Sequence, residues 1–369
     1  MPMPTVADVL AAVDRLAPFR QAEEWDNVGL LLGDAARPVR RVLVALDASD
    51  ETCAEAERTR ADCVVVHHPL IFHGVKRLTA DTRAGQLALR LAAGRRALIA
   101  AHTNLDGAVG GLCDLLGRKV GLVDLEPLQH TPPQTKYKVV VFVPPADLER
   151  VRAAMFAAGA GHIGNYTECA FASEGEGTFL PGERARPAVG RRGRRSAVRE
   201  VRLEVLAGEG RLARVLAAAV RAHSYEEPAI DVYPLKGVAP GAGVGRVGRL
   251  ARPMRLARFA EVVKRVLRRK AVGLAGDPRA RIERVALCTG GGGSVVAAAR
   301  ASRAQAYLTG ELAMHEVQEL SAFGIACILG GHYETERIPL EAWMPRLARG
   351  LKGIDVRMSR SERAPVSVK

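Results

Sequence analysis

Short, almost uninterrupted apolar runs alternate with helical segments in this 369-residue chain, and this alternation restricts its possible folds most strongly. The runs lie in RRVLVALDAS (40–49), DCVVVHHP (62–69) and RALIAAHTNLD (96–106), and segments such as ETCAEAERTRA and GQLALRLAAG between them have helical spacing of apolar residues. Strands that are apolar throughout are buried on both faces, as in sheets covered by helices. The sequence therefore predicts a layered α/β domain.

The middle of the chain follows a different order of elements. Segments with strand and helix patterns occur there in the order β-α-β-β-α-β, which is that of a ferredoxin-like unit. Because this unit is complete in itself, we expect an inserted domain, with the α/β pattern resuming after it. The expected parts are residues 1–135 (first half of the α/β metal-binding domain), 136–236 (the insert) and 237–369 (second half).

Two segments are expected to lack regular structure. Residues 236–248 (KGVAPGAGVGRVG) are rich in glycine, which is typical of a return linker after the insert. Residues 359–369 (SRSERAPVSVK) are expected to form a frayed tail.

The composition is that of a soluble globular protein, with 48% apolar and 25% charged residues. No stretch has the ~18 consecutive apolar residues of a membrane span, and Asp8 and Asp14 lie where a signal peptide needs a basic start and an apolar middle. We therefore expect a cytoplasmic protein without membrane contact. Its six cysteines lack CxxC spacing, so we expect reduced, mostly buried thiols instead of a zinc knuckle or disulfides.

The net charge of +14 is concentrated in residues 184–202 and 252–270. One interpretation is a surface that binds phosphate groups or nucleic acid. The other is a solvated loop and the outer face of a helix in an arginine-rich chain. Because aromatic residues are only 4% of the chain, base-stacking platforms for nucleic acid are not expected.

Two adjacent histidines mark the end of one predicted strand. His67 and His68 follow three valines and precede Pro69, which ends the strand ladder. Open α/β sheets place their ligand crevices at the carboxyl ends of strands. Successive side chains on a strand point to opposite faces, so the pair suits two neighbouring ions, or one ion and a supporting role.

Two other predicted strands end in the same way. His102 and Asp106 follow the apolar run that ends at residue 101, and His332 and Glu336 follow IACILGG with i,i+4 spacing, which projects both from one helical face. Such a set suits two cations roughly 3.5–4 Å apart with one bridging carboxylate and open positions for water. The expected ligands are His67, His68, Asp106, His332 and Glu336.

Other polar side chains near these motifs have two interpretations each. His102 and His315 are expected either to orient ligands and donate protons or to satisfy buried backbone groups. Glu311 is either a general base or the N-cap of the next helix. Asn27 and Asn104 are expected to line a substrate pocket.

Two further features lie close to these motifs. Trp25 is expected to pack against its neighbours. The segment CTGGGGS (288–294) lies between a predicted strand and helix, where backbone amides can hold phosphate, but it lacks the P-loop lysine. A tight turn with close backbone packing is the favoured interpretation of this segment.

Six motifs in one order carry a resemblance to a known family: WDNVGLLLGD, VLVALDAS, HHPLIFHGVKRLT, HTNLDGAVGG, YLTGELAMHE and GGHYETER. They resemble the dinuclear-metal-centre hexameric proteins of the NIF-three-like family, many of which carry the name GTP cyclohydrolase I type 2 homologue. The resemblance covers residues 1–130 and 237–350, and the insert is similar to the PII/CutA-like domain of longer bacterial members. Members often have a histidine where this chain has Met314, which removes a possible substrate-facing imidazole.

The resemblance implies the same five ligands, with Glu336 as the bridge, and a toroidal homohexamer, either a trimer of dimers or a dimer of trimers. Two divalent ions per chain are expected, and histidine and carboxylate ligands admit zinc, iron, manganese or nickel. The predicted activity is a two-metal hydrolase acting on a nucleotide or another phosphate-containing small molecule. Two alternatives stay open: a non-enzymatic metal-dependent regulatory or binding protein, and a nucleic-acid-associated factor.

Overall fold

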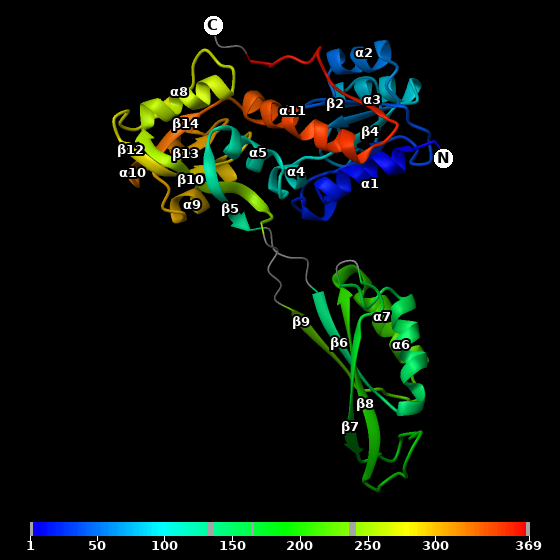
Figure 1. The fold of residues 1–369 in the computed structure, drawn as a ribbon. Coiled ribbons are helices and arrows are strands. Elements are labelled where there is room, and N and C mark those ends of the chain that lie inside the picture. Colours follow the sequence, from blue (N-terminus) through cyan, green and yellow to red (C-terminus); the bar gives the residue numbers. More distant parts are fainter. Residues whose placement is uncertain (1–2, 131–135, 164–165, 236–240, 367–369) are drawn as a thin grey trace. The chain divides into compact units, whose positions relative to one another are not determined.

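The computed structural model describes residues 3–130, 136–163, 166–235 and 241–366 (Figure 1). The chain divides into two compact units: the first consists of Met1–Thr131 and Pro240–Lys369, and the second of Pro132–Ala239. The first unit thus combines two stretches of chain that are separated in sequence by the second unit. It contains two sheets, and the prediction of an α/β fold is confirmed.

The first sheet of this unit has the strand order β1-β4-β3-β2-β15. Strands β15, β2, β3 and β4 are parallel, and β1 pairs antiparallel with β4. Every residue of β3 and β4 is buried, as the apolar runs predicted. The strands are β1 (Gly29–Leu32), β2 (Arg41–Ala45), β3 (Cys63–Val66), β4 (Ala97–Ala100) and β15 (Asp355–Met358), and the helices α1 (Val6–Leu16), α2 (Asp50–Arg58), α3 (Arg83–Ala93), α4 (Thr103–Gly107) and α5 (Leu112–Lys119).

The second sheet has the order β11-β14-β13-β12-β10-β5. Its strands are β5 (Leu122–His130), β10 (Gly243–Arg255), β11 (Gly273–Ala275), β12 (Arg281–Leu287), β13 (Ala306–Thr309) and β14 (Ala326–Leu329), and its helices α8 (Leu256–Val266), α9 (Val296–Ala301) and α10 (Met314–Ala322). Helix α11 (His332–Gly350) joins the two sheets, since Trp343 and Leu347 lie in the core of the first and Ile338 in the core of the second (Figure 1).

The second unit contains one antiparallel sheet with the order β7-β8-β6-β9. Its elements follow the chain as β6 (Lys136–Val143), α6 (Leu148–Ala157), β7 (Ala170–Phe179), β8 (Ser196–Gly208), α7 (Glu209–Ala222) and β9 (Ile230–Leu235). Helices α6 and α7 cover one face of the sheet (Figure 1), where Met155 and Val215 pack against Val141 and Leu203. This is the element order of a ferredoxin-like unit.

The last part of the glycine-rich segment expected as a linker, residues 243–248, belongs to a strand. Residues 236–240 lie outside the described residues, but β10 begins at Gly243 and pairs with both β5 and β12. Gly245 has a φ of +64°, and a Cβ there would lie 2.8 Å from the carbonyl oxygen of Leu287. The glycines therefore allow close strand packing, and the linker prediction is wrong from Gly243 onward.

The expected frayed tail is ordered over its first residues. Ser359 and Glu362 are buried. The Ser359 amide donates to the Val44 carbonyl at 2.7 Å, and Glu362 Oε1 accepts the Leu46 and Asp47 amides at 2.8 and 2.7 Å. These bonds fasten the tail to β2 and the residues after it, so the prediction is wrong for residues 359–362.

Among the described residues, none of the helices has both the length and the apolar character needed to cross a bilayer.

Candidate metal centre

The residues that follow three buried strands meet in the first unit. His67 and His68 come directly after β3, His102 follows β4 and precedes α4, and His332 is the first residue of α11, which comes after β14. Glu336 lies one turn into α11, beneath His332. The strand ends, which belong to both stretches of the unit, thus bring imidazoles and carboxylates to one place, as the sequence predicted.

Glu336 lies at the middle of this cluster. Its carboxylate oxygens are 3.1 Å from His68 Nε2, 3.1 Å from His332 Nε2 and 3.7 Å from His67 Nε2. Asp106 Oδ2 lies 3.6 Å from His67 Nε2. All five ligands expected from the sequence are therefore close together.

His102 also lies within this cluster. Its ring centroid is 5.1 Å from that of His67 and 5.5 Å from that of His68. Two overlapping groups have ligand atoms within 4.8 Å of one another: His67 with His68 and His102, and His68 with His332 and Glu336. Because His68 belongs to both groups, the arrangement suits two adjacent cation positions, and His102 is a sixth possible ligand.

Each of the four imidazoles is held at Nδ1 by an oxygen acceptor. The pairs are His67 with the Ala101 carbonyl (2.8 Å), His68 with Asp47 (2.9 Å), His102 with Asp26 (2.9 Å) and His332 with Glu311 (3.1 Å). A carbonyl or carboxylate oxygen only accepts, so each Nδ1 carries a proton, and Nε2 is the ring atom that can bind a cation once it has lost its own proton. Metal-binding histidines are oriented in this way. The buried His67 Nε2 has no hydrogen-bond partner among the described residues, which fits an atom reserved for a cation.

The carboxylates and imidazoles shift one another's pKa. Burial lowers the pKa of His68, but hydrogen bonds to Asp47 and Glu336 outweigh it and raise the pKa to about 10. The hydrogen bond to Glu336 raises the pKa of His332 to about 9. Burial opposes ionisation of Glu336, yet three imidazoles hold its pKa well below the usual range. Burial raises the pKa of Asp106.

The CTGGGGS segment forms one side of the centre. Thr289 Oγ1 donates to Asp106 Oδ1 at 2.6 Å, and the Gly290 amide donates to Thr335 Oγ1 at 3.1 Å. Gly290 has a φ of +60°, and a Cβ there would overlap the Glu336 carboxylate and lie 3.1 Å from His332 Nε2. Gly290 thus leaves room for two ligands, in agreement with the interpretation of this segment as a close-packed turn.

A cavity of about 230 Å³ opens beside the cluster. His102 and Asp106 line one end of it, and Trp25 is among its other lining residues. Ser294, Gly291 and Thr289 of the CTGGGGS segment also line it. A small molecule in this cavity would therefore lie against two members of the cluster.

Several expected site residues have other positions or partners. Asn104 is fully buried; its side chain accepts the His102 amide at 2.9 Å and donates to the Ala17 carbonyl at 2.7 Å, so the prediction that it lines a substrate pocket is wrong. Asn27 donates to the Ile71 carbonyl and thereby fastens the loop after the histidine pair.

Of the two candidate site residues near α10, Glu311 contacts the cluster and His315 does not. His315 is exposed on α10, and it belongs to neither of the two groups of possible ligands found among the described residues. Glu311 does not cap α10, because Ala313 is the N-cap and Glu316 accepts its amide at 2.8 Å. Glu311 instead holds His332, so of its two expected roles the capping role is excluded.

Asp26 and Asp47 were not anticipated as partners of the histidines. Both occur in motifs named above, WDNVGLLLGD and VLVALDAS, and Asp47 follows β2 as the histidines follow β3. A carboxylate just after a buried strand was thus a signal available in the sequence. Asp26 has no such strand before it, and only the fold shows that it lies beside His102.

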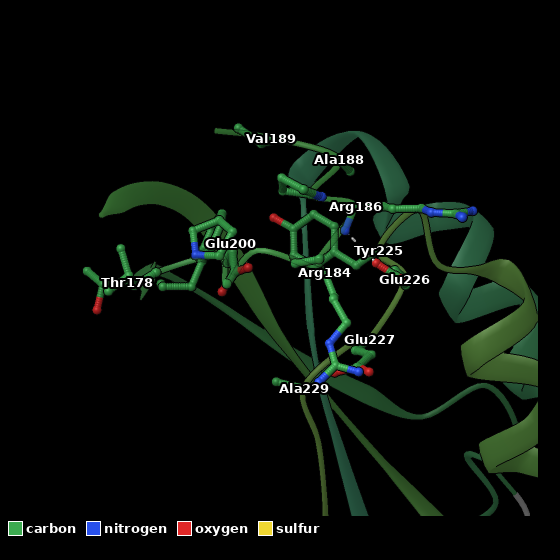
Figure 2. A pocket seen from close by; sticks show the side chains of 17 residues that line it. Thr178, Arg184, Arg186, Ala188, Val189, Glu200, Tyr225, Glu226, Glu227 and Ala229 are labelled. Atoms are coloured by element: carbon green, nitrogen blue, oxygen red, sulfur yellow. Dashed lines mark hydrogen bonds between the residues drawn. The ribbon is translucent and has the colours of Figure 1, made fainter. Parts of the chain in front are cut away.

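A second cavity, of about 550 Å³, lies in the second unit (Figure 2). The loop after β7 and the segment around Tyr225 line it, and Arg184, Glu200 and Glu227 bring charges of both signs to it. Burial raises the pKa of Tyr225 to about 12. Because its charges are mixed and largely exposed, this cavity indicates no single class of ligand.

The model of one protein family matches almost the whole chain. It is described as Duf34/NIF3 (NGG1p interacting factor 3) and covers residues 4–365.

Proteins similar to this chain carry related names. A Halalkalibacterium halodurans protein named GTP cyclohydrolase 1 type 2 homolog is 36% identical, covering 93% of this chain and 92% of its own length. A Mycobacterium tuberculosis protein of the same name is 41% identical, covering 90% and 88%. The crystal structure of a Bacillus cereus protein related to NIF3 has 34% identity and a TM-score of 0.75 and covers both chains completely.

Proposed function

Because the chain belongs to the Duf34/NIF3 family, we propose that its histidine cluster holds two divalent cations and that the protein is a metal-dependent hydrolase. Its substrate would be a nucleotide or another phosphate-containing small molecule. The observation that carries this proposal is the set of four imidazoles, each fixed at Nδ1, three of which place Nε2 within 3.7 Å of the Glu336 carboxylate. Such a donor set suits zinc, iron, manganese or nickel.

The proposed ligands are His67, His68, Asp106, His332 and Glu336, and His102 is a sixth candidate. Glu336 is the proposed bridge, since both of its oxygens lie near imidazole nitrogens. A pair of cations here would supply Lewis acidity and lower the pKa of a hydrolytic water.

The chain's own residues would prepare the site for this chemistry. Asp26, Asp47 and Glu311 hold a proton on Nδ1 of three imidazoles, so that Nε2 is the atom from which a cation would displace a proton. Thr289 fixes one oxygen of Asp106 and leaves the other toward His67. The side chain of Glu311 is 67% exposed, so it is also able to exchange a proton with solvent.

The proposed nucleotide and the proposed oligomeric state come from similar proteins. The names of the similar proteins make a guanine nucleotide the first substrate to test. We also propose a homohexamer, as in the hexameric proteins that the motifs resemble, and analytical ultracentrifugation tests this: a monomer at micromolar concentration would contradict it.

Elemental analysis of protein purified without chelator tests the metal assignment. We expect about two ions per chain in the wild type, and loss of metal in His68→Ala and Glu336→Ala. His315→Ala is the matched control, because this exposed histidine is outside the cluster. Retention of all metal in both cluster variants would reject the site.

A screen of nucleotides and phosphoesters with the loaded protein then tests the hydrolase assignment. Turnover that disappears together with the metal would support it. Bound metal without turnover on any substrate would favour a metal-dependent binding protein. Nucleic-acid binding with steep salt dependence would favour the nucleic-acid-associated alternative.

A further inference from the structure

An exposed tryptophan lines the cavity beside the metal cluster. Trp25 is 57% exposed, whereas Trp343, the only other tryptophan of the chain, is 1% exposed. The expectation that Trp25 packs against its neighbours is therefore wrong for more than half of the side chain's surface, which is open to solvent. Other aromatic side chains of this chain are exposed too, such as Phe323, so it is the position of Trp25 at the cavity beside the cluster that suggests a binding role.

The backbone that carries Trp25 is firmly held. The adjacent Asp26 accepts hydrogen bonds from the Thr103 amide (3.0 Å) and hydroxyl (2.5 Å) and from His102 Nδ1 (2.9 Å). On the other side, the Glu23 amide donates to Thr103 Oγ1 at 3.0 Å. The indole is thus presented by a preorganised segment, which lowers the entropic cost of binding a ligand.

Trp25 is part of a small aromatic surface at this place. Its ring centroid is 5.6 Å from that of Phe72, which is 37% exposed, and 6.2 Å from that of His102, whose ring is edge-on to it. Aromatic faces of this kind bind planar rings by stacking, largely independently of which ring is presented.

The size and lining of the cavity restrict what this surface can bind. Its volume of about 230 Å³ is below the ~300–1,000 Å³ of pockets that enclose drug-sized ligands. It therefore has room for a single ring system and not for a complete nucleotide. Gln129 and Ser294, which also line it, offer an amide and a hydroxyl to the polar edge of such a ring.

We propose that Trp25 is a specificity-determining residue that stacks on a planar nitrogen heterocycle of the nucleobase class. The polar edge of the ring would enter the cavity, beside His102 and Asp106. This inference rests on the proposed function for the identity of the cluster as the reacting centre, and it narrows the substrate to molecules that contain such a ring.

Acrylamide quenching of tryptophan fluorescence tests the proposal directly. Because Trp343 is buried, quenching in the wild-type protein reports mainly on Trp25. We expect guanosine monophosphate to protect Trp25 in a saturable manner in zinc-loaded protein. Ribose 5-phosphate and inorganic phosphate, which lack the ring, are expected to give no protection at the same concentrations.

Calorimetric titration of variants with guanosine monophosphate separates stacking from other contacts. Trp25→Ala is expected to weaken binding about tenfold or more, and Trp25→Phe, which keeps an aromatic face, to restore most of the affinity. Phe323→Ala is the matched control, since Phe323 is 60% exposed and does not line the cavity. If the protein turns the nucleotide over, Trp25→Ala should raise KM and leave kcat nearly unchanged.

Three results would overturn the proposal: equal affinity in Trp25→Ala and wild type, equal protection by probes without the ring, or a Trp25 that is already shielded before any probe is added. The last result would assign this surface to a contact with a second copy of the chain. Binding is the readout here, so protection by the ring without any turnover would reject the hydrolase assignment and leave this inference standing.

Discussion

The four histidines of the cluster are oriented by groups outside the three segments that contain the ligands, HHPLIFHGVKRLT, HTNLDGAVGG and GGHYETER. Asp47 shows this most clearly, because its carboxylate holds His68, the imidazole shared by both groups of possible ligands. Partners of this kind typically change metal affinity by about 10–100-fold when they are removed. The affinity of the centre should therefore depend on residues that never touch a cation.

Asp47→Ala tests this dependence. We expect it to weaken zinc binding by about 10–100-fold while the fold is kept, because the hydrogen bond that fixes His68 Nδ1 is lost. Asp47→Asn, which can still accept that bond, should lose less. Competition with a chromophoric chelator measures the affinity. Glu319→Gln is the control, because the Glu319 carboxylate pairs with Arg300 and not with a histidine of the cluster. Unchanged affinity in Asp47→Ala would contradict the orienting role.

Gly290 has an equally specific requirement. Its positive φ and its contact with Glu336 and His332 exclude a side chain, so we expect Gly290→Ala to displace these ligands and to lose most of the bound metal. At Gly291 a Cβ would meet nothing within 4 Å, so Gly291→Ala should keep its metal. Metal content and circular dichroism of both variants check this. Equal metal content would show that the loop adjusts.

The raised imidazole pKa values make cation binding pH-dependent. In the cation-free protein the pKa of His68 is about 10 and that of His332 about 9, so both rings are protonated at neutral pH. A cation must displace these protons, and we expect release of about two per chain and an affinity that rises with pH up to about pH 9 to 10. Calorimetry in buffers of different ionisation enthalpy counts the protons; binding without proton release would show that the rings are already neutral.

At the level of elements, the apolar strands were predictable and the glycine-rich strand was not. Strands β2, β3 and β4 could be predicted because each is a short run of β-branched and aliphatic residues, nearly all of them buried. Strand β10 has glycines where β5 and β12 approach closely, as at Gly248, whose Cβ would lie 2.8 Å from the Val123 carbonyl oxygen. Only the tertiary packing shows why a strand there needs glycine, so the local pattern indicated a linker.

The segment after β15 is held to α2 by one buried carboxylate. Glu55 accepts hydrogen bonds from Ser359 Oγ at 2.6 Å and from the Arg360 and Ser361 amides at 2.9 Å each. Loss of this acceptor leaves the buried Ser359 hydroxyl and two partly buried amides without their partner, and we expect Glu55→Ala to lower the free energy of unfolding by about 2–3 kcal/mol. Urea denaturation measures it.

Glu51→Ala is the control for that experiment. Glu51 lies on the same helix but is exposed, so its removal should cost at most a few tenths of a kcal/mol. Equal destabilisation by both substitutions would show that the bonds from Glu55 to the tail contribute nothing specific.

For the whole molecule, the sequence predicted which side chains form the metal cluster, but not which neighbouring residues orient them. The five expected ligands could be chosen because all of them lie just after apolar strands, although β3 and β4 belong to one sheet and β14 to the other, so that only the fold shows how the two strand edges meet. The sequence did not predict His102 as a ligand candidate, the carboxylates that hold Nδ1 or the exposure of Trp25. These features depend on the conformation of loops, which no periodic pattern encodes. Loop conformation is set by tertiary contacts, which is why this layer of the site was missed or left open.

The origin of the ligands in two distant stretches of chain has a consequence for stability. His67 and Glu336 are more than 200 positions apart, so the unfolded chain rarely brings them together and binds cations weakly. A ligand that binds only the folded state stabilises it by about 2.7 kcal/mol at 100 times its Kd. Metal should therefore stabilise the unit formed by Met1–Thr131 and Pro240–Lys369.

Tryptophan fluorescence follows this unit alone, because Trp25 and Trp343 both belong to it. We expect chelation to lower the urea midpoint detected by fluorescence, and added zinc to restore it in proportion to the logarithm of its concentration. Glu336→Gln should unfold with the same midpoint with and without zinc, since the proposed bridge is gone. If zinc leaves the wild-type midpoint unchanged, cations do not link the two stretches of chain, and the cluster would be a hydrogen-bonded network of imidazoles and carboxylates instead.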